Sequence, residues 1–135
     1  MFWKVSALWQ RGLRDLLTPL DLTHTQYVLL ASLGWLDRSS QAELAKHTGC
    51  DEMTVSAVVR TIAAKGWVDR QNDNQDRRAK LLRITPLGAA LADKAVPLVE
   101  KFDRQFFIDR LGNRKDSFLK SLDWLSRAEE PRRTS

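Results

Sequence analysis

Cysteine, histidine, glycine and proline are all scarce in this sequence. Its 135 residues include one cysteine, two histidines, six glycines and four prolines. A single cysteine cannot form an internal disulfide, which fits a reducing compartment. No apolar run approaches the roughly 18 to 20 residues that cross a bilayer, and the N-terminal stretch lacks a signal-peptide core and cleavage site. We therefore expect a cytoplasmic protein without a membrane partner.

The motifs of catalysis and metal binding are also missing. The chain has no Gly-rich phosphate loop, no nucleophile elbow and no triad that two histidines and one cysteine could build. His47 and Cys50 lie three residues apart, but a zinc site usually needs four such ligands, so carboxylates would have to complete it. Packing is favoured over a redox or metal role for Cys50, which follows a turn glycine. We expect no enzymatic activity, no cofactor and no metal.

What the chain does have is an ordinary globular balance, 43% hydrophobic and 29% charged, with an excess of positive charge. This length and composition predict one compact domain with its own core, or a small domain plus extra elements that need a partner. The net charge is +5 and the pI is about 9.7, which favours a polyanionic partner. Most of the excess lies in residues 53–83, where seven basic and three acidic side chains give +4.

The first part of the chain predicts two helices. Residues 4–17 carry an apolar stripe, and Thr18-Pro19 ends that helix. Thr23 and Gln26 have the spacing of a capping box, which starts the second helix.

Residues 41–61 predict two short helices joined by a tight turn. Ser40 and Glu43 form another capping box, Gly49 suits a turn that needs positive φ, and Ala45 is small where the helices would cross. Four apolar residues of the second helix recur at helical spacing and face inward: Val55, Val58, Val59 and Ile62. This arrangement is typical of a helix-turn-helix, although a generic pair of packed helices would also show it.

The outer face of the second short helix is basic and rich in hydroxyl groups. A recognition helix reads bases in the major groove with its N-terminal residues, so this face is the predicted DNA contact. Its members are Met53, Thr54, Ser56, Ala57, Arg60 and Thr61. Arg60 is the strongest candidate, because a guanidinium can pair twice with guanine or clamp a phosphate, and an ordinary surface arginine is the alternative.

Two short strands follow, over residues 67–70 and 79–85, joined by the polar stretch NDNQDRRAK at residues 72–80. Composition alone favours a solvated turn for this stretch. Its place directly after a basic helix favours a wing that contacts DNA.

The C-terminal part of the chain predicts two more helices. Thr85-Pro86 is an N-cap with proline at the first helical position, so a long helix should run from there towards residue 109. Pro97 should kink or break it. A last amphipathic helix covers residues 114–128.

The terminal helices carry more apolar surface than a core of about 60 residues can cover. We therefore expect a two-fold homodimer, which would set two recognition helices in successive major grooves of an inverted repeat. The predicted dimer contacts are Val5, Leu8, Trp9, Phe118, Leu122 and Leu125. Five tryptophans suit core and subunit contacts, and the alternative is a cleft for a small aromatic or phenolic effector lined by Trp9, Tyr27 and Trp35.

Three segments together carry a resemblance to a known family: LTHTQYVLL, QAELAKHTGCDEMTVSAVVRTIAAKGWVDR and DNQDRRAKLLRITPLGAAL. Over roughly residues 5–125 the chain resembles the multiple antibiotic resistance regulator (MarR) family of bacterial transcription factors. The resemblance implies a mainly α (α+β) winged helix-turn-helix with N- and C-terminal dimerisation helices. The implied parts are N-terminal helices 1–36, a DNA-binding lobe 37–85, C-terminal dimerisation helices 86–128 and a flexible tail 129–135.

The most specific part of the resemblance is DRRAK at residues 76–80 followed by ITPLG at residues 84–88. These strings are similar to the family's D-x-R wing motif and to its LT-x-x-G entry into the next helix. The resemblance implies that Asp76 braces the wing and Arg78 enters the minor groove, whose negative potential favours an inserted arginine. Lys80 is a further wing contact, and Arg77 is either a phosphate contact or a solvated neighbour.

Two features depart from common family patterns. Ala57 stands where many relatives have a larger polar or basic residue, so base reading would rest on fewer side chains. The peroxide-sensing branch has a cysteine near the first helix, and this chain has none there.

The resemblance implies a dimeric repressor that occupies an inverted-repeat operator and is released by a small anionic or phenolic ligand. A winged-helix scaffold used for protein contacts is the alternative.

Overall fold

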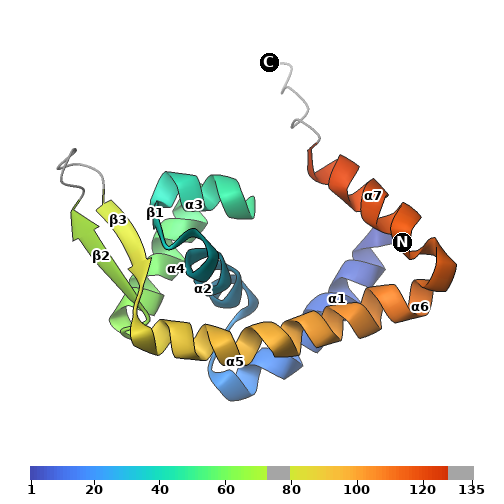
Figure 1. The fold of residues 1–135 in the computed structure, drawn as a ribbon, viewed down its shortest axis with the longest axis horizontal. Helices are drawn as coiled ribbons and strands as arrows, with labels where there is room; N and C mark the ends of the chain where they lie inside the picture. The colour runs from blue at the N-terminus through green and yellow to red at the C-terminus, as the bar shows by residue number, and fades with distance from the viewer. Residues whose placement is uncertain (73–79, 128–135) are drawn as a thin grey trace. The chain divides into compact units, whose positions relative to one another are not determined.

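The computed structural model describes residues 1–72 and 80–127 (Figure 1). Its contacts divide the chain into two compact units, Met1–Glu100 and Lys101–Ser135. The main helices are α1 (Phe2–Leu17), α2 (His24–Leu36), α3 (Gln41–Thr48), α4 (Glu52–Ala64), α5 (Pro86–Asp103), α6 (Asp109–Leu111) and α7 (Lys115–Ser126). The strands are β1 (Arg38–Ser40), β2 (Val68–Asn72) and β3 (Lys80–Ile84).

The capping signals of α2 and α3 are confirmed. In α2 the Thr23 hydroxyl accepts from the Gln26 N–H at 3.2 Å, and Gln26 Oε1 accepts from the Thr23 N–H at 3.0 Å. Ser40 and Glu43 make the same reciprocal pair at the start of α3. Gly49 ends α3 with φ of 74°, a conformation that glycine adopts without steric cost. Local sequence therefore determines where these helices begin and turn.

The core of the first unit lies where α2, α3, α4 and β3 meet. Its fully buried side chains include Leu29, Leu33, Leu44, Val55, Val59, Ile62 and Leu82. Ala45, only 5% exposed, allows α3 to pack close to α4, as its small size predicts. Val58 is half-buried, so the inward stripe of α4 is largely as expected.

A small antiparallel sheet with the strand order β1-β3-β2 stands next to α4. The predicted hairpin is confirmed, with Val68 opposite Ile84 and Asn72 opposite Lys80. Strand β1 pairs with β3 and was not predicted, because its three residues, Arg38, Ser39 and Ser40, carry no apolar alternation.

The base of the hairpin is joined to the start of α5 through Thr85. Its N–H donates to the Trp67 carbonyl at 3.0 Å, and its hydroxyl donates to the Gly66 carbonyl at 2.6 Å. The same hydroxyl accepts from the Gly88 N–H at 3.1 Å, which confirms the N-cap. A Cβ on Gly88 would overlap the Trp67 carbonyl oxygen and lie 3.0 Å from Ile84 Cγ1. Only glycine allows this close approach of helix and hairpin.

Of the two outcomes predicted at Pro97, the break is wrong, because α5 continues through it to Asp103, and the kink stays a prediction. Pro97 is exposed, so the proline ring lies on the solvent side of the helix, where a carbonyl left without its N–H partner can bond to water. The helical pattern first changes in a π-helical turn at Arg104–Ile108.

The second unit is organised around phenylalanines. Phe106 lies 5.7 Å from Phe102 and 4.8 Å from Phe107, measured between ring centroids. Phe107 stacks on Phe118 of α7 at 5.7 Å. These aromatic contacts hold α7 against the helical segment that precedes it.

Candidate nucleic-acid interface

The first turn of α4 is capped by Asp51. Asp51 Oδ1 accepts from the Thr54 N–H at 2.7 Å, and Asp51 Oδ2 accepts from the Thr54 hydroxyl at 2.9 Å. The Thr54 backbone N–H, and then its hydroxyl, lower the pKa of Asp51 below its ordinary value. Sequence reasoning missed this residue, although an aspartate before an apolar-periodic run is a known N-cap signal.

The two faces of α4 differ sharply in exposure. Val55, Val59 and Ile62 are fully buried on one side. On the other side Met53 is 85% exposed, and Ala57, Arg60 and Thr61 are also exposed. The remaining predicted contacts, Thr54 and Ser56, are half-buried at the edge of this outer face. The six predicted residues therefore share one helix, with a surface that is open to a ligand.

Of the predicted wing contacts, Asp76, Arg77 and Arg78 lie outside the described residues. Lys80 opens β3 and is exposed, and Arg70 on the neighbouring strand is exposed as well. The exposed Arg83 of β3 forms an ion pair with Asp37 at 3.7 Å. The described part of the hairpin thus presents basic side chains beside α4.

Not every basic residue of this region is available to a partner. Lys65 Nζ lies 3.1 Å from Asp21 Oδ2 and 4.6 Å from the ring centroid of Trp67. Its side chain is only 32% exposed. Lys65 therefore contributes to the packing at the end of α4 more than to the positive surface.

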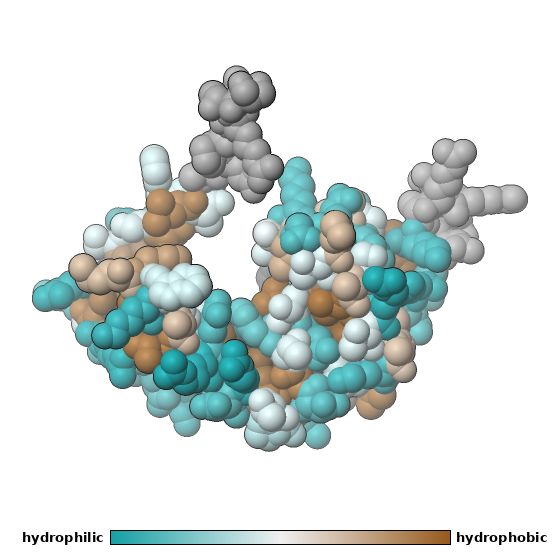
Figure 2. All heavy atoms as spheres, turned by 180° about the vertical axis from the view of Figure 1, so that it is seen from behind, coloured by the Kyte–Doolittle hydropathy of each residue, from teal (hydrophilic) through white to brown (hydrophobic). Residues whose placement is uncertain are grey.

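The six predicted dimer contacts lie on α1 and α7. Four are exposed: Val5 at 43%, Leu8 at 44%, Leu122 at 37% and Leu125 at 62%. Trp9 is half-buried with its ring edge 5.2 Å from His24, and Phe118 is half-buried. Further apolar side chains, which sequence reasoning did not select, are exposed on the same two helices: Phe2, Trp3, Leu119 and Trp124. In Figure 2 apolar residues interrupt the hydrophilic surface in several places.

A pocket of about 410 Å³ lies between α1 and α2. Its lining includes Gln10, Arg14, Thr18, Leu22, Thr23, His24 and Thr25. Among the predicted effector residues, Trp9 packs against His24, Tyr27 is half-buried, and Trp35 is 82% exposed. Sequence reasoning selected the aromatic residues and missed Arg14 and His24, because nothing in their local sequence marks them as neighbours.

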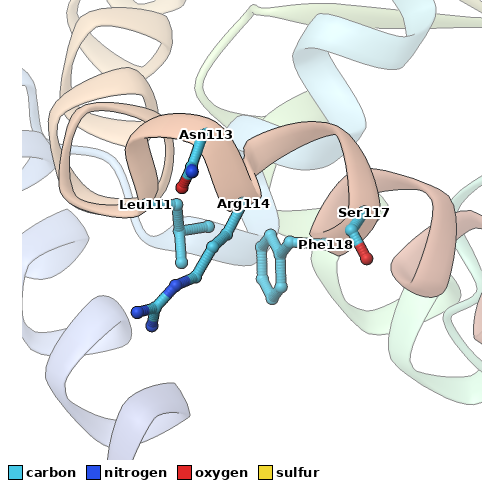
Figure 3. A pocket seen from close by; sticks show the side chains of 5 residues that line it. All are labelled: Leu111, Asn113, Arg114, Ser117 and Phe118. Carbon is cyan, nitrogen blue, oxygen red and sulfur yellow. The ribbon is translucent and has the colours of Figure 1, made fainter.

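A second pocket, of about 590 Å³, belongs to the C-terminal unit (Figure 3). It is shallow and lined by Leu111, Asn113, Arg114, Ser117 and Phe118. Within residues 1–72 and 80–127, no three His, Cys, Asp or Glu side chains are grouped so that they could hold a metal ion. None of the helices that the structure describes has the length and apolar character to cross a membrane.

Comparison with known proteins agrees with this geometry. The MarR family model matches residues 22–80. The HTH-type transcriptional regulator YdcH of Bacillus subtilis is 36% identical over 133 residues, which cover 96% of this chain and 89% of that protein. The HTH-type transcriptional repressor NicR of Pseudomonas putida is 40% identical over 77 residues, covering 57% of this chain and 49% of NicR.

Among solved structures, a cysteine-to-serine mutant of MarR from E. coli, complexed with operator DNA, is similar with a TM-score of 0.83. It is 25% identical, and the match covers 94% of this chain and 91% of that one. The exposed outer face of α4, the hairpin that follows it and the relatives over nearly the whole length lead to one conclusion. The chain belongs to the MarR family of winged-helix, DNA-binding transcriptional regulators, which are not enzymes.

Proposed function

We propose that the chain is a cytoplasmic, homodimeric repressor that binds an inverted-repeat operator and is released by a small anionic or phenolic effector. The observation that carries the proposal is the contrast between the two faces of α4: the outer face exposes four side chains, whereas Val55, Val59 and Ile62 on the opposite face are fully buried. The exposed side chains are Met53, Ala57, Arg60 and Thr61. A helix anchored in this way can enter a major groove without disturbing the core. Arg60 then contacts guanine or a phosphate, and Arg78 of the wing enters the adjacent minor groove.

The exposed apolar residues of α1 and α7 support the dimer. Side chains such as Trp3, 86% exposed, and Trp124, 73% exposed, are costly to leave in water. A second copy of the chain would cover them with the same residues, as a two-fold interface requires. Repression is supported by the similarity to NicR, a protein named as a transcriptional repressor.

Selection of bound DNA from a random pool tests the proposal directly, because a recovered palindrome reports binding, dimer symmetry and half-site spacing together. On the selected operator, Arg60→Ala and Arg78→Ala should each cost about 1–3 kcal/mol of binding free energy in a gel-shift titration. Arg127→Ala is the matched control, because Arg127 is paired with Asp123 of its own helix at 3.1 Å and should leave affinity unchanged.

A salt titration separates DNA reading from a protein-contact scaffold. Phosphate binding releases counterions, so operator affinity should fall steeply as salt rises. Removal of one phosphate-contacting arginine should reduce the slope by about one. An operator affinity that does not depend on salt, or unchanged binding by both arginine variants, would contradict the proposed DNA contacts of α4 and the wing.

The pocket between α1 and α2 is the proposed effector site. Arg14 supplies a cation for a carboxylate or phenolate, and Leu22 supplies an apolar wall. Benzoate is a suitable probe of this chemistry. It should weaken operator binding of the unaltered protein, and Arg14→Gln should blunt that response without changing affinity in the absence of benzoate. Equal responses of the two proteins would contradict the assignment of this pocket and leave the DNA-binding proposal standing.

A further inference from the structure

The hydrogen bonds that start α4 differ from those that start α2 and α3. In α2 and α3 the third helical residue is Gln26 or Glu43, and its side chain bonds back to the N-cap backbone. In α4 the third residue is Thr54, which donates both its N–H and its hydroxyl to Asp51, at 2.7 Å and 2.9 Å. Both carboxylate oxygens of Asp51 are therefore occupied by one residue.

This arrangement fixes the direction of the Thr54 hydroxyl. A carboxylate only accepts hydrogen bonds, so the single hydroxyl hydrogen of Thr54 points to Asp51. The hydroxyl has only acceptor lone pairs left for any outside partner, and the Asp51 oxygens likewise only accept. Thr54 is half-buried and Asp51 is exposed, so both groups reach the surface at the first turn of α4.

Few groups in DNA can donate a hydrogen bond to these acceptors. In the major groove the only donors are the exocyclic amino groups of adenine and cytosine, whereas guanine and thymine present acceptors alone. Phosphate oxygens also only accept, and the charge of Asp51 repels them. Every base pair carries one such amino group, on adenine in A·T and on cytosine in G·C. An acceptor therefore detects which strand of the pair carries the amino group.

We propose that Thr54, oriented by Asp51, is a specificity-determining residue that selects adenine or cytosine at one position of each operator half-site. The proposal rests on the proposed entry of α4 into the major groove. Arg60, further along the same helix, has only donors and takes the opposite preference, for guanine or a phosphate. Asp51 and Thr54 thus present acceptors at the start of α4, and Arg60 presents donors further along the helix.

The test compares DNA selected from a random pool by the unaltered protein and by Thr54→Val. Valine keeps the shape of the side chain and the backbone N–H bond to Asp51, and it removes only the hydroxyl. The unaltered protein should select one orientation of a base pair, with adenine or cytosine on the strand that Thr54 faces, at a position where Thr54→Val shows no preference between the two orientations. Discrimination there should fall about five- to tenfold, the effect of roughly one hydrogen bond. Thr54→Ser keeps the hydroxyl and should keep the preference.

A second variant tests the role of Asp51 as a positioning residue. In Asp51→Asn the amide oxygen still accepts from the Thr54 N–H, but the amide nitrogen donates to the Thr54 hydroxyl oxygen. The hydroxyl hydrogen is then free to point outward. The same operator position should consequently admit the reversed base pair, with guanine or thymine on the strand that Thr54 faces, a change of preference that the loss of a purely structural cap would not produce.

Ser121→Ala is the matched control, because it removes a hydroxyl that donates within α7, at 2.9 Å to the Ser117 carbonyl. It should select the same sequence as the unaltered protein, and thermal unfolding of each variant checks that it folds. The proposal is overturned if Thr54→Val changes no position, or if Asp51→Asn leaves the orientation of the base pair unchanged at the position that Thr54→Val relaxes. If Thr54→Val does not fold, the other two variants test the proposal. Thr54→Ser should keep the base preference of the unaltered protein and Asp51→Asn should change it, and failure of either result overturns the proposal. Enrichment of no sequence by the unaltered protein would overturn the proposed function itself.

Discussion

The DNA-binding lobe and the terminal helices use similar apolar side chains but bury them to different extents. In the lobe, Leu44, Val55 and Ile62 are fully buried within one chain. In α1 the C-terminal half is buried through Leu13 and Leu17, whereas most apolar residues of the N-terminal half are exposed. No residue of α7 is buried. The core of the lobe is thus completed within one chain with the help of α2, and the ends of the chain have apolar faces that the proposed dimer would cover.

Truncation in the lobe should have the largest effect. Ile62→Ala removes fully buried methyl groups and should lower the free energy of unfolding by about 2–5 kcal/mol, measured by urea denaturation. Leu125→Ala, a comparable truncation at a 62% exposed position, should cost less than about 0.5 kcal/mol at concentrations where the chain is monomeric. If the two variants lost the same free energy of unfolding, the difference in burial between the lobe and α7 would have no consequence for stability.

Truncation of α7 should instead appear in the association of two chains. Leu122→Ala combined with Leu125→Ala should raise the dissociation constant of the dimer by roughly 10- to 100-fold, because each leucine loses apolar area in the interface. Sedimentation equilibrium measures this constant, and Lys120→Ala, at another exposed position of α7, serves as the control. A chain that stays monomeric at micromolar concentration without any substitution would refute the dimer.

The smallest expected effect is on the stability that Asp51, the exposed N-cap of α4, contributes to the folded protein. The pKa of Asp51 is lowered in the folded state by the two hydrogen bonds from Thr54, so ionised Asp51 stabilises the folded protein. This contribution is fully present above the ordinary pKa of about 4 and is lost as the pH falls through the lowered value. The stability difference between the unaltered protein and Asp51→Asn should therefore be largest near neutral pH and shrink in acid, measured by thermal unfolding at several pH values. A difference that does not change with pH would exclude the ionised cap as its cause.

The features that the sequence predicts correctly are those set by neighbouring residues. The two capping boxes, the turn at Gly49 and the N-cap at Thr85 each depend on residues within a few positions of one another, and the hairpin pairs two strands that follow one another in the chain. The inward and outward faces of α4 follow from helical periodicity in the same way. The outer face of the candidate interface could therefore be identified without a structure.

The features that were missed depend on distant contacts or on weak local patterns. Strand β1 exists because β3 pairs with it, and its own three residues give no β signal. Arg14 and His24 come together only when α1 packs on α2. Pro97 is tolerated because it lies on the exposed side of α5, which a local rule for proline does not take into account. The predicted contacts Asp76, Arg77 and Arg78 remain predictions.

The contact of Gly88 with the Trp67 carbonyl has a consequence for sequence variation. Gly88 lies within α5 without positive φ, so its requirement is for space and not for an unusual backbone conformation. Every other amino acid carries a Cβ, and even alanine would displace the hairpin from the helix. This position has no conservative replacement, so any coding change at Gly88 alters how the wing is joined to the helix that follows it.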